Sequence, residues 1–355
     1  MSEFFTGTTA VREGHRFDED RLREWFADQV DRSARQRLAV SQFKGGQSNP
    51  TFLVESAERR YVLRRKPAGA LLPSAHAVER EFRVMRALAG TGVPVPHMHA
   101  LCEDAAVIGS TFYIMDFVEG RILWDPKLPG LARAERGAIC DEMNRVIAAL
   151  HEVDVAAVRL ADYGRSGHYI ARQIDRWSRQ YRASETERIE AMEQLMAWLA
   201  ARQPADSATR LVHGDFRLDN LVFDRASPRV IAVLDWELST LGDPLADFAY
   251  HCMAWQLPPP FRGLGELNDA QMRALGLPTE ADGLQRYRER RALGQLDPAL
   301  WHFYAAFNLF RAAAIAQGIL GRALAGNASN PHALEAGRQA RQLAQLGWDR
   351  AQAAR

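Results

Sequence analysis

Apolar and polar positions follow two different patterns along the chain, and the change lies near Gly120. Before Gly120, short runs in which apolar and polar residues alternate predict strands at 38–43, 51–55 and 61–66. A glycine pair and a polar break separate these runs, so the three strands are expected to form an antiparallel meander. Residues 105–118 predict two further strands.

Helical spacing of apolar residues dominates the rest of the chain. Two helices are expected within the first region, one after the capping residue Asp18 and one after Ser74, which could also act as a cap. Beyond Gly120 a single β-rich island, residues 211–234, interrupts a mainly helical pattern, which indicates two lobes divided near Gly120. The longer helices are expected at 131–151, 168–182, 185–202 and 300–325.

Composition narrows the class of protein. A chain of 355 residues with 47% hydrophobic and 25% charged residues is typical of a globular enzyme. The net charge of +1 provides no overall field for nucleic acid or anionic lipid, so neither is expected as a partner. The three cysteines lie far apart, and we find neither a basic, apolar leader nor a later stretch of membrane-spanning length. These features predict a cytoplasmic protein.

The run from His213 to Asn220 carries the strongest chemical signal in the sequence. Asp215 and Asn220 lie five positions apart in a loop between short apolar strands. Asp215 could orient a substrate hydroxyl and take its proton, and Asn220 could offer a carbonyl oxygen to Mg²⁺. Arg217 would then reach the transferred phosphate, whereas His213 is expected to shape the loop backbone.

Asp235 ends the apolar run 230–234, so its carboxylate is expected at the tip of a buried strand. A charge at that position needs a counter-ion, and Mg²⁺ bound jointly to Asn220 and Asp235 would supply it. The alternative is that Asp235 is an ordinary turn or cap residue. Asp243 and Asp247 are interpreted as structural, and Asp247 could brace the loop backbone.

The first region offers groups for the phosphates of a nucleotide. A glycine-rich loop with Ser48 and Asn49 joins two predicted strands and would let backbone N–H groups approach an anion, although a plain hairpin turn is the alternative. Arg64 is the preferred phosphate-contacting cation and Lys66 the second choice, and either could instead be a solvated charge. Glu81 borders the apolar stripe of its helix and would pair with one of these cations, unless it is simply solvated.

Taken together, these segments resemble the aminoglycoside phosphotransferase-like kinases, whose fold is that of protein kinases. The resemblance spans most of the chain and implies an α+β, two-lobed fold: a small antiparallel β N-lobe with one helix over 1–118, and a larger, mainly helical C-lobe over 119–355. The matching segments are Gly45–Asn49, Tyr61–Arg64, Glu81, His213–Asp215 with Asn220, Leu234–Glu237 and Gly242–Pro244.

The same resemblance implies an ATP- and Mg²⁺-dependent phosphotransferase with an alcohol group as acceptor. Arginine stands at position 64, where protein kinases carry a lysine, and tryptophan and glutamate follow Asp235, so preference for ATP over GTP stays open. The implied roles are Asp215 as catalytic base, Asn220 and Asp235 as magnesium ligands, and Asp116 and Val118, after Met115, as backbone contacts of adenine.

Three stretches, 64–67, 71–81 and 310–318, are most similar to a branch of this family that occurs fused to acyl-CoA dehydrogenases. This branch implies phosphorylation of a hydroxyacyl-CoA, such as a 4-hydroxyacyl-CoA, and a functional link to an acyl-CoA dehydrogenase. The chain itself carries no glycine fingerprint of a dinucleotide site, so no dehydrogenase activity is expected of it. The arginine-rich stretch 286–291 could hold coenzyme A phosphates or be a solvated helix face.

Other functions stay open at this point. One is an aminoglycoside or other small-alcohol kinase, although residues 262–297 mix arginines with carboxylates and lack the acidic character that a polycation would need. Another is a pseudokinase that binds a nucleotide without chemistry. A serine hydrolase centred on Ser166 is disfavoured, because a nucleophile elbow needs glycine at position 168, where histidine stands.

Overall fold

Two units make up the chain in the computed structural model, which describes residues 7–44, 49–67, 77–258, 261–326 and 333–354. The chain passes between the units several times, and the predicted lobe boundary after residue 118 stays a prediction. The first unit contains Met1–Trp124, Ala156–Leu160 and Arg217–Ser239, and the second contains Asp125–Val155, Ala161–Phe216 and Thr240–Arg355.

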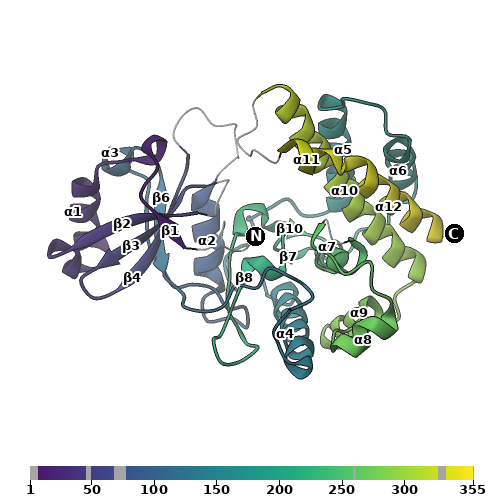
Figure 1. The fold of residues 1–355 in the computed structure, drawn as a ribbon, viewed down its shortest axis with the longest axis horizontal. Helices are drawn as coiled ribbons and strands as arrows, with labels where there is room; N and C mark the ends of the chain where they lie inside the picture. The colour runs from purple at the N-terminus through teal and green to yellow at the C-terminus, as the bar shows by residue number, and fades with distance from the viewer. Residues whose placement is uncertain (1–6, 45–48, 68–76, 259–260, 327–332, 355) are drawn as a thin grey trace. The chain divides into compact units, whose positions relative to one another are not determined.

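A six-stranded antiparallel sheet forms the centre of the first unit, in the order β1-β2-β3-β4-β6-β5 (Figure 1). The predicted meander is confirmed, because β2 pairs with β3 and β3 pairs with β4. β4 is therefore an inner strand, flanked on its other side by β6. The strands are Thr8–Thr9 (β1), Leu38–Phe43 (β2), Thr51–Ser56 (β3), Arg60–Arg65 (β4), Met98–Cys102 (β5) and Phe112–Asp116 (β6).

Strand alternation gives the two faces of this sheet different partners. On one face, α1 (Glu19–Gln29) packs its buried Phe26 against Tyr61 of β4, with ring centroids 5.1 Å apart. On the other face, Tyr113 of β6 reaches α2 (Val78–Leu88), where its hydroxyl donates to Glu81 at 3.2 Å. Arg64 shares the face of Tyr113, as the alternation along β4 predicts.

One of the predicted strands within 105–118 is wrong. Phe112–Asp116 forms β6, but Ala105–Ile108 forms a short helix, α3, and the neighbouring strand β5 lies earlier in the chain. The Asp104 carboxylate accepts a hydrogen bond from the N–H of Ala106 at 2.8 Å and so caps the helix. Gly109 follows in a left-handed conformation with φ +85°, which ends it.

The predicted helix that opens the fold is confirmed, because Asp18 caps α1 through the N–H groups of Asp20 and Arg21. α2 begins at Val78, and the predicted cap Ser74 lies outside the described residues. Two later strands, β8 (Leu221–Phe223) and β9 (Val230–Val233), also belong to the first unit and pair antiparallel.

Gly120 lies where the backbone approaches β8 closely. The carbonyl oxygen of Phe223 would be 2.3 Å from a Cβ atom at Gly120, so a side chain there would displace the strand. Two backbone hydrogen bonds between Arg121 and Phe223, at 2.7 and 2.8 Å, fix this approach.

The second unit is mainly helical, as predicted, with a two-stranded sheet of β7 (Arg210–Val212) and β10 (Thr240–Gly242). The long helix α10 lies beside α5, α6, α7, α11 and α12 (Figure 1). The helices are α4 (Arg133–His151), α5 (Tyr169–Ala183), α6 (Glu190–Ala201), α7 (Pro244–Gln256), α8 (Asp269–Leu275), α9 (Glu280–Arg290), α10 (Pro298–Leu324), α11 (Ala333–Arg338) and α12 (Ala340–Ala353).

Helix α10 corrects the expectation that no stretch reaches membrane-spanning length. Among the described residues it is the one helix that is long and apolar enough to cross a bilayer, with 27 residues and a mean hydropathy of 1.3. In the folded unit, 78% of its apolar window is buried. Such burial is typical of the core helix of a large helical unit, because neighbouring helices cover most of it.

Candidate active site

The loop from His213 to Asn220 joins β7 to β8 and contributes to both units. His213, Gly214, Asp215 and Phe216 belong to the second unit, and the residues from Arg217 onward belong to the first. The chemical groups that the sequence predicts for this site are therefore described unit by unit.

A buried carboxylate on α7 braces the beginning of this loop in the second unit. The two oxygens of Asp247 accept hydrogen bonds from the backbone N–H groups of His213 and Gly214, both at 2.8 Å. The predicted bracing role of Asp247 is thereby confirmed. Burial alone would raise the pKa of Asp247, but hydrogen bonds from His151 and from the His213 backbone hold it below its ordinary value.

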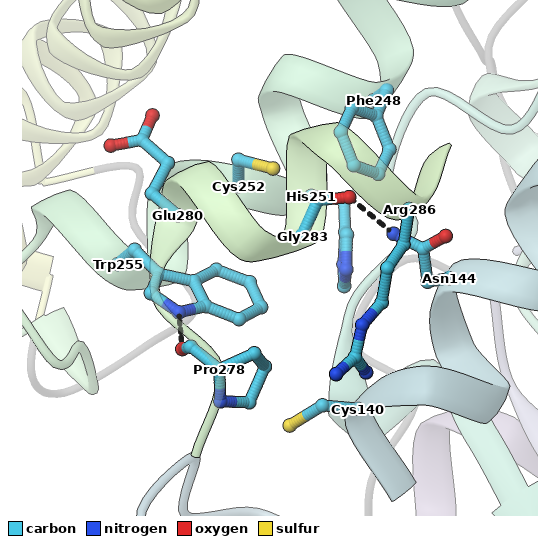
Figure 2. A pocket seen from close by; sticks show the side chains of 10 residues that line it. All are labelled: Cys140, Asn144, Phe248, His251, Cys252, Trp255, Pro278, Glu280, Gly283 and Arg286. Carbon is cyan, nitrogen blue, oxygen red and sulfur yellow. Dashed lines mark hydrogen bonds between the residues drawn. The ribbon is translucent and has the colours of Figure 1, made fainter. Parts of the chain in front are cut away.

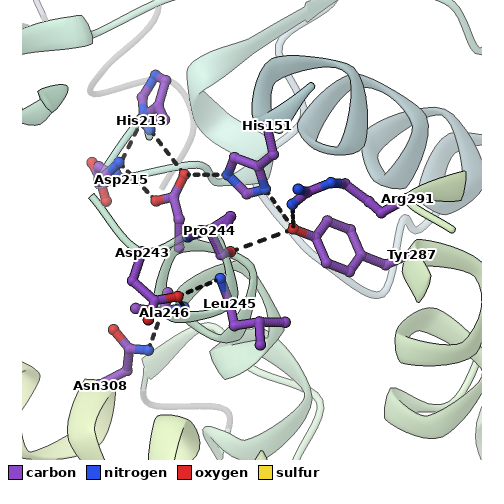
Figure 3. Close-up of polar contacts among 12 residues, drawn as sticks. His151, His213, Asp215, Asp243, Pro244, Leu245, Ala246, Tyr287, Arg291 and Asn308 are labelled. Atoms are coloured by element: carbon purple, nitrogen blue, oxygen red, sulfur yellow. Dashed lines mark hydrogen bonds and ion pairs between the residues drawn. The ribbon is translucent and has the colours of Figure 1, made fainter. Parts of the chain in front are cut away.

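His151, one of the partners of Asp247, belongs to a chain of hydrogen bonds that also contains Tyr287 and Arg291 (Figure 3). Because ionised Asp247 can only accept, the neutral ring of His151 carries its proton on Nε2 and accepts at Nδ1 from the Tyr287 hydroxyl at 2.6 Å. Arg291 donates to the same hydroxyl at 2.7 Å, and the carbonyl oxygen of Pro244 lies 3.5 Å from it. Nε2 of His151 donates to Asp247 at 3.1 Å. Burial lowers the pKa of His151, which keeps the ring neutral in this role.

Asp215 is half-buried and is held by two groups of the same unit. Its backbone N–H donates to Nδ1 of His213 at 3.2 Å, which confirms that His213 shapes the loop. Its Oδ1 accepts a hydrogen bond from the hydroxyl of Tyr250 at 2.5 Å. Sequence reasoning missed Tyr250; the available signal was its position three residues after Asp247, on the same side of α7.

Arg311 on α10 also supports the loop. The guanidinium is buried, with 8% of the residue exposed, and donates to the carbonyl of Gly214 at 3.0 Å. Gly214 has φ +83°, a left-handed conformation that glycine adopts without strain. The brace and the buried cation together fix the backbone that leads into Asp215.

In the first unit, Arg64 lies among three carboxylates. Its Nη2 is 2.7 Å from Oδ1 of Asp235 and 3.5 Å from Oε2 of Glu237, and its Nε is 3.2 Å from Oε2 of Glu81. The predicted pairing of Glu81 with a strand cation is confirmed for Arg64. Lys66 instead pairs with Glu79 at 2.8 Å.

Glu81 is almost fully buried, with 1% exposed, and accepts hydrogen bonds from Tyr113 at 3.2 Å and from the side-chain amide of Asn49 at 3.1 Å. Burial raises the pKa of Glu81 to about 7, against the opposing effect of Arg64. Burial would lower the pKa of Arg64, but the surrounding carboxylates, led by Glu81, hold it above its ordinary value. Arg64 therefore stays charged.

Asp235 has a backbone conformation that is rare for a residue with a side chain. Its φ is +64°, in the left-handed region, immediately after β9. Strain of this kind is found where the position of a side chain matters for function. The N–H of Leu234 donates to the carbonyl of Asn220 at 2.9 Å, so the backbones of the two predicted metal ligands are neighbours.

These donors fit magnesium better than a transition metal. Mg²⁺ takes oxygen ligands, usually one or two carboxylates together with phosphates and water. Within the described ranges, no cluster of three or more His, Cys, Asp or Glu side chains could hold a metal by itself. The carboxylate of Asp235 and the amide oxygen of Asn220 match the small number of oxygen ligands that a protein usually supplies to Mg²⁺.

The other predicted site residues have the following surroundings. The fully buried Asn49 side chain contacts Glu81, so any contact with a nucleotide would come from its backbone. Arg217 is half-exposed and pairs with Asp219 at 2.7 Å. Ser48 lies outside the described residues. Met115 is buried on β6, Val118 is half-buried just after it, and the N–H of Asp116 donates to the carbonyl of His97 at 2.9 Å.

A small cavity in the second unit lies between α4, α7 and the start of α9 (Figure 2). The space for the centre of a water molecule is about 10 Å³, which admits about one water and no acceptor substrate. Arg286 at its edge pairs with Asp141 at 3.0 Å, and Arg290 pairs with the same carboxylate at 2.8 Å. These arginines pair with a carboxylate of α4, which favours the interpretation of 286–291 as a helix face over a site for coenzyme A phosphates.

Comparison with known proteins identifies the family. The model of the phosphotransferase enzyme family matches residues 39–293 of the chain. The chain belongs to the phosphotransferase enzyme family. Its predicted identity as a phosphotransferase is thereby confirmed, as is the predicted kinase-like fold.

Curated relatives of this phosphotransferase carry a different name. It is 46% identical over 342 residues to acyl-CoA dehydrogenase family member 10 of Mus musculus. The matched region covers 96% of this chain and 32% of the relative. It is also 47% identical over 358 residues to Probable acyl-CoA dehydrogenase IBR3 of Arabidopsis thaliana. Here the matched region covers 94% of this chain and 43% of the relative. The chain thus spans less than half the length of these relatives.

Solved structures agree on the fold. A Ralstonia eutropha JMP134 protein that has provisionally been named an aminoglycoside phosphotransferase is 52% identical, with a TM-score of 0.86 over 95% of this chain and 99% of that chain. The aminoglycoside phosphotransferase APH(4)-Ia, in complex with AMP-PNP and hygromycin B, is 18% identical, with a TM-score of 0.60 over 93% and 98%. At that identity the second likeness shows the kinase-like fold alone.

Proposed function

We propose that this phosphotransferase uses ATP and Mg²⁺ to phosphorylate a hydroxyl group of a hydroxyacyl-CoA, such as a 4-hydroxyacyl-CoA. The observation that carries phosphoryl transfer is Asp215, held on a loop whose backbone N–H groups are bonded to the buried Asp247. The acceptor class is supported by identities of 46% and 47% to proteins named as acyl-CoA dehydrogenases. A functional link to such a dehydrogenase, and a cytoplasmic location, belong to the same proposal.

In this proposal Asp215 acts as the general base. Its carboxylate accepts a hydrogen bond from the acceptor hydroxyl and orients the oxygen toward the γ-phosphorus of ATP. As the new oxygen–phosphorus bond forms, the bond from the γ-phosphorus to the β,γ-bridging oxygen breaks, and Asp215 takes the hydroxyl proton. The products are a phosphate monoester and ADP, and the proton is released to solvent.

The groups of the first unit act on the nucleotide. Asn220 and Asp235 would hold Mg²⁺, which when bound neutralises charge that develops on the phosphate oxygens. Arg64, held in orientation by Glu81, and Arg217 would donate to phosphate oxygens. The N–H of Asp116 already bonds to His97, so adenine would meet Asp116 through its carbonyl and Val118 through its backbone.

One alternative acceptor has a specific observation in its favour. The provisional name of the Ralstonia eutropha protein, at 52% identity, would make this chain an aminoglycoside kinase. Against this, the described arginines of α9 and the carboxylates near them pair with one another and form no acidic surface for a polycation.

A substrate panel decides between these acceptors. The enzyme is incubated with ATP and Mg²⁺ and with hydroxyacyl-CoAs, matched acyl-CoAs without the hydroxyl, aminoglycosides or small alcohols, and the products are weighed by mass spectrometry. We expect phosphate transfer to a hydroxyacyl-CoA and none to its matched control. Transfer to an aminoglycoside only would overturn the proposed acceptor, and transfer to nothing in the panel would favour the pseudokinase.

A further inference from the structure

A tyrosine that belongs to none of the motifs singled out in the sequence contacts the predicted base. Tyr250 lies on α7 and is half-buried, and its hydroxyl donates to Oδ1 of Asp215 at 2.5 Å. This separation lies in the range of a hydrogen bond from a hydroxyl to an ionised carboxylate, about 2.5–2.7 Å, which is stronger than a bond between neutral groups.

We propose that Tyr250 is a positioning residue, which sets the rotation of the Asp215 carboxylate before the acceptor arrives. Rotation about the last bond of an aspartate side chain has a broad energy profile, so packing alone fixes it poorly. A strong bond to one oxygen restricts that rotation, and the direction of the carboxylate decides whether an acceptor hydroxyl is aimed at the phosphorus. This inference rests on Asp215 being the base of the proposed reaction.

Tyr250 is itself held by a buried cation. The guanidinium carbon of Arg311 lies 5.0 Å from the centroid of the Tyr250 ring and 5.6 Å from that of Trp177 on α5. Both distances are within the reach of a cation–π interaction. Arg311 therefore links α5, α7 and α10 at the point where the tyrosine meets the catalytic loop.

The same arginine contacts the loop one residue before Asp215. Its Nη2 donates to the carbonyl of Gly214 at 3.0 Å, while its Nε is buried without a hydrogen-bond partner among the described residues. A buried charge with an unsatisfied donor is unfavourable for folding. Arg311 thus holds the Asp215 backbone through Gly214 and the Asp215 carboxylate through Tyr250, and we infer that this double contact is why the unfavourable burial is tolerated.

The test is Tyr250→Phe, which removes the hydroxyl and keeps the ring against Arg311. Two probes are used: phosphorylation of 4-hydroxypentanoyl-CoA, and the slow release of ADP when water is the acceptor, which needs no acyl-CoA. A misdirected base is expected to lower kcat by about tenfold to a hundredfold with both probes. The KM for ATP is expected to change by less than about twofold, because Tyr250 bonds to the proposed base and none of the predicted nucleotide contacts lies on α7.

The matched control is Tyr181→Phe, which removes a buried hydroxyl from α5 of the same unit. We expect its kcat and KM to equal those of the wild type. A second variant, Arg311→Gln, removes the cation that holds Tyr250 and is expected to lower kcat in the same way. Each variant is compared at a temperature at which its melting curve shows it fully folded.

The outcomes separate this inference from the proposed function. An unchanged kcat in folded Tyr250→Phe overturns the positioning role, and so does a raised KM for the acceptor at constant kcat, which would make Tyr250 an acceptor contact. If the wild type leaves 4-hydroxypentanoyl-CoA untouched while Tyr250→Phe slows ADP release, the acceptor proposal fails and the positioning role stands.

Discussion

Arg64 and Asp235 form an ion pair, with Nη2 and Oδ1 2.7 Å apart. The residue predicted to contact phosphate thus neutralises the residue predicted to bind magnesium. Binding of the metal at Asp235 and of phosphate at Arg64 would separate the two charges and give each a new partner. Because both residues would change partners, mutations at Arg64 and Asp235 test the predicted nucleotide and magnesium contacts of the first unit most directly.

Arg64→Ala is expected to destabilise the protein, and more so at high pH. Glu81 would lose its partner while buried, at a cost of about 3 kcal/mol when it is ionised. Burial has already raised the pKa of Glu81 from 4.5 to about 7. The contribution of this shift to the free energy of unfolding is therefore fully present below pH 4.5 and is lost as the pH rises through 7. Without Arg64 the pKa rises further, and the free energy of unfolding should fall more at pH 8 than at pH 6.

Urea denaturation of wild type and Arg64→Ala at the two pH values measures this difference. The double variant Arg64→Ala/Glu81→Gln is the control, because it removes the buried charge together with its partner and should recover most of the loss at pH 8. An equal loss at both pH values, with no recovery in the double variant, would contradict the assignment of an ionised Glu81 held by Arg64.

Asp235→Asn is expected to weaken the use of magnesium. Loss of the carboxylate should raise the Mg²⁺ concentration for half-maximal turnover by at least about tenfold and lower kcat by about a hundredfold, since the metal stabilises charge in the transition state. Asp224→Asn is the matched control, because Asp224 belongs to the exposed turn between β8 and β9 and accepts hydrogen bonds from Ala226 and Ser227. Equal magnesium titrations for the two variants would rule out Asp235 as a ligand.

Asp247→Asn is expected to disturb the loop rather than nucleotide binding. Two backbone N–H groups and His151 donate to this carboxylate, and an amide cannot accept all three bonds in the same geometry. Each hydrogen bond to a charged group contributes about 1.5–3 kcal/mol, so the unfolding free energy and kcat should both fall markedly. The Kd for ATP, measured by calorimetry, should stay within about twofold, and a selective loss of ATP affinity would argue against this role.

His251 on α7 is expected to make the protein sensitive to acid. Burial lowers its pKa to about 4 from an ordinary value of 6.5, against the opposing effect of Asp247. The unfolded chain therefore binds a proton that the folded protein excludes, so the stability is present above pH 6.5 and is lost as pH falls through 4. The difference corresponds to at most about 3 kcal/mol.

Urea denaturation between pH 7 and pH 4 tests this prediction. The informative quantity is the change of the free energy of unfolding with pH, and not its absolute value. His251 packs against Phe216 and Trp255, so His251→Gln should destabilise the protein at every pH. Its free energy of unfolding should nevertheless fall less steeply with acid than that of the wild type. Parallel curves would show that His251 is protonated equally in the folded and unfolded states.

Local patterns predicted the parts of the site that depend on one or two elements. Helical spacing placed Glu81 inward on α2, so its pairing with Arg64 or Lys66 could be anticipated, and the structure shows the pair with Arg64. Asp247 could be predicted as a brace because a turn, a proline and a carboxylate follow one another at the start of α7.

Contacts among elements distant in the chain were beyond this reasoning. The bond from Tyr250 to Asp215 depends on how α7 is rotated against the loop, and the position of Arg311 depends on the packing of α10. The four apolar residues of α3 fitted a strand equally well, and only the cap of Asp104 and the turn at Gly109 make them helical. The contacts of Tyr250 and Arg311 are set by tertiary packing, which a single sequence does not display, whereas the cap and the glycine of α3 are local signals that sequence reasoning missed.

The central claim, that Asp215 activates a hydroxyl of a hydroxyacyl-CoA for phosphoryl transfer, is tested most directly by phosphorus NMR of the product. Wild type and Asp215→Asn are incubated with ATP, Mg²⁺ and 4-hydroxypentanoyl-CoA, after both are shown to be folded and to bind ATP. We predict a phosphate-monoester resonance coupled to the carbinol proton with the wild type, and none with the variant. An ester formed equally by both proteins, or inorganic phosphate as the only new phosphorus species besides ADP, would contradict the account.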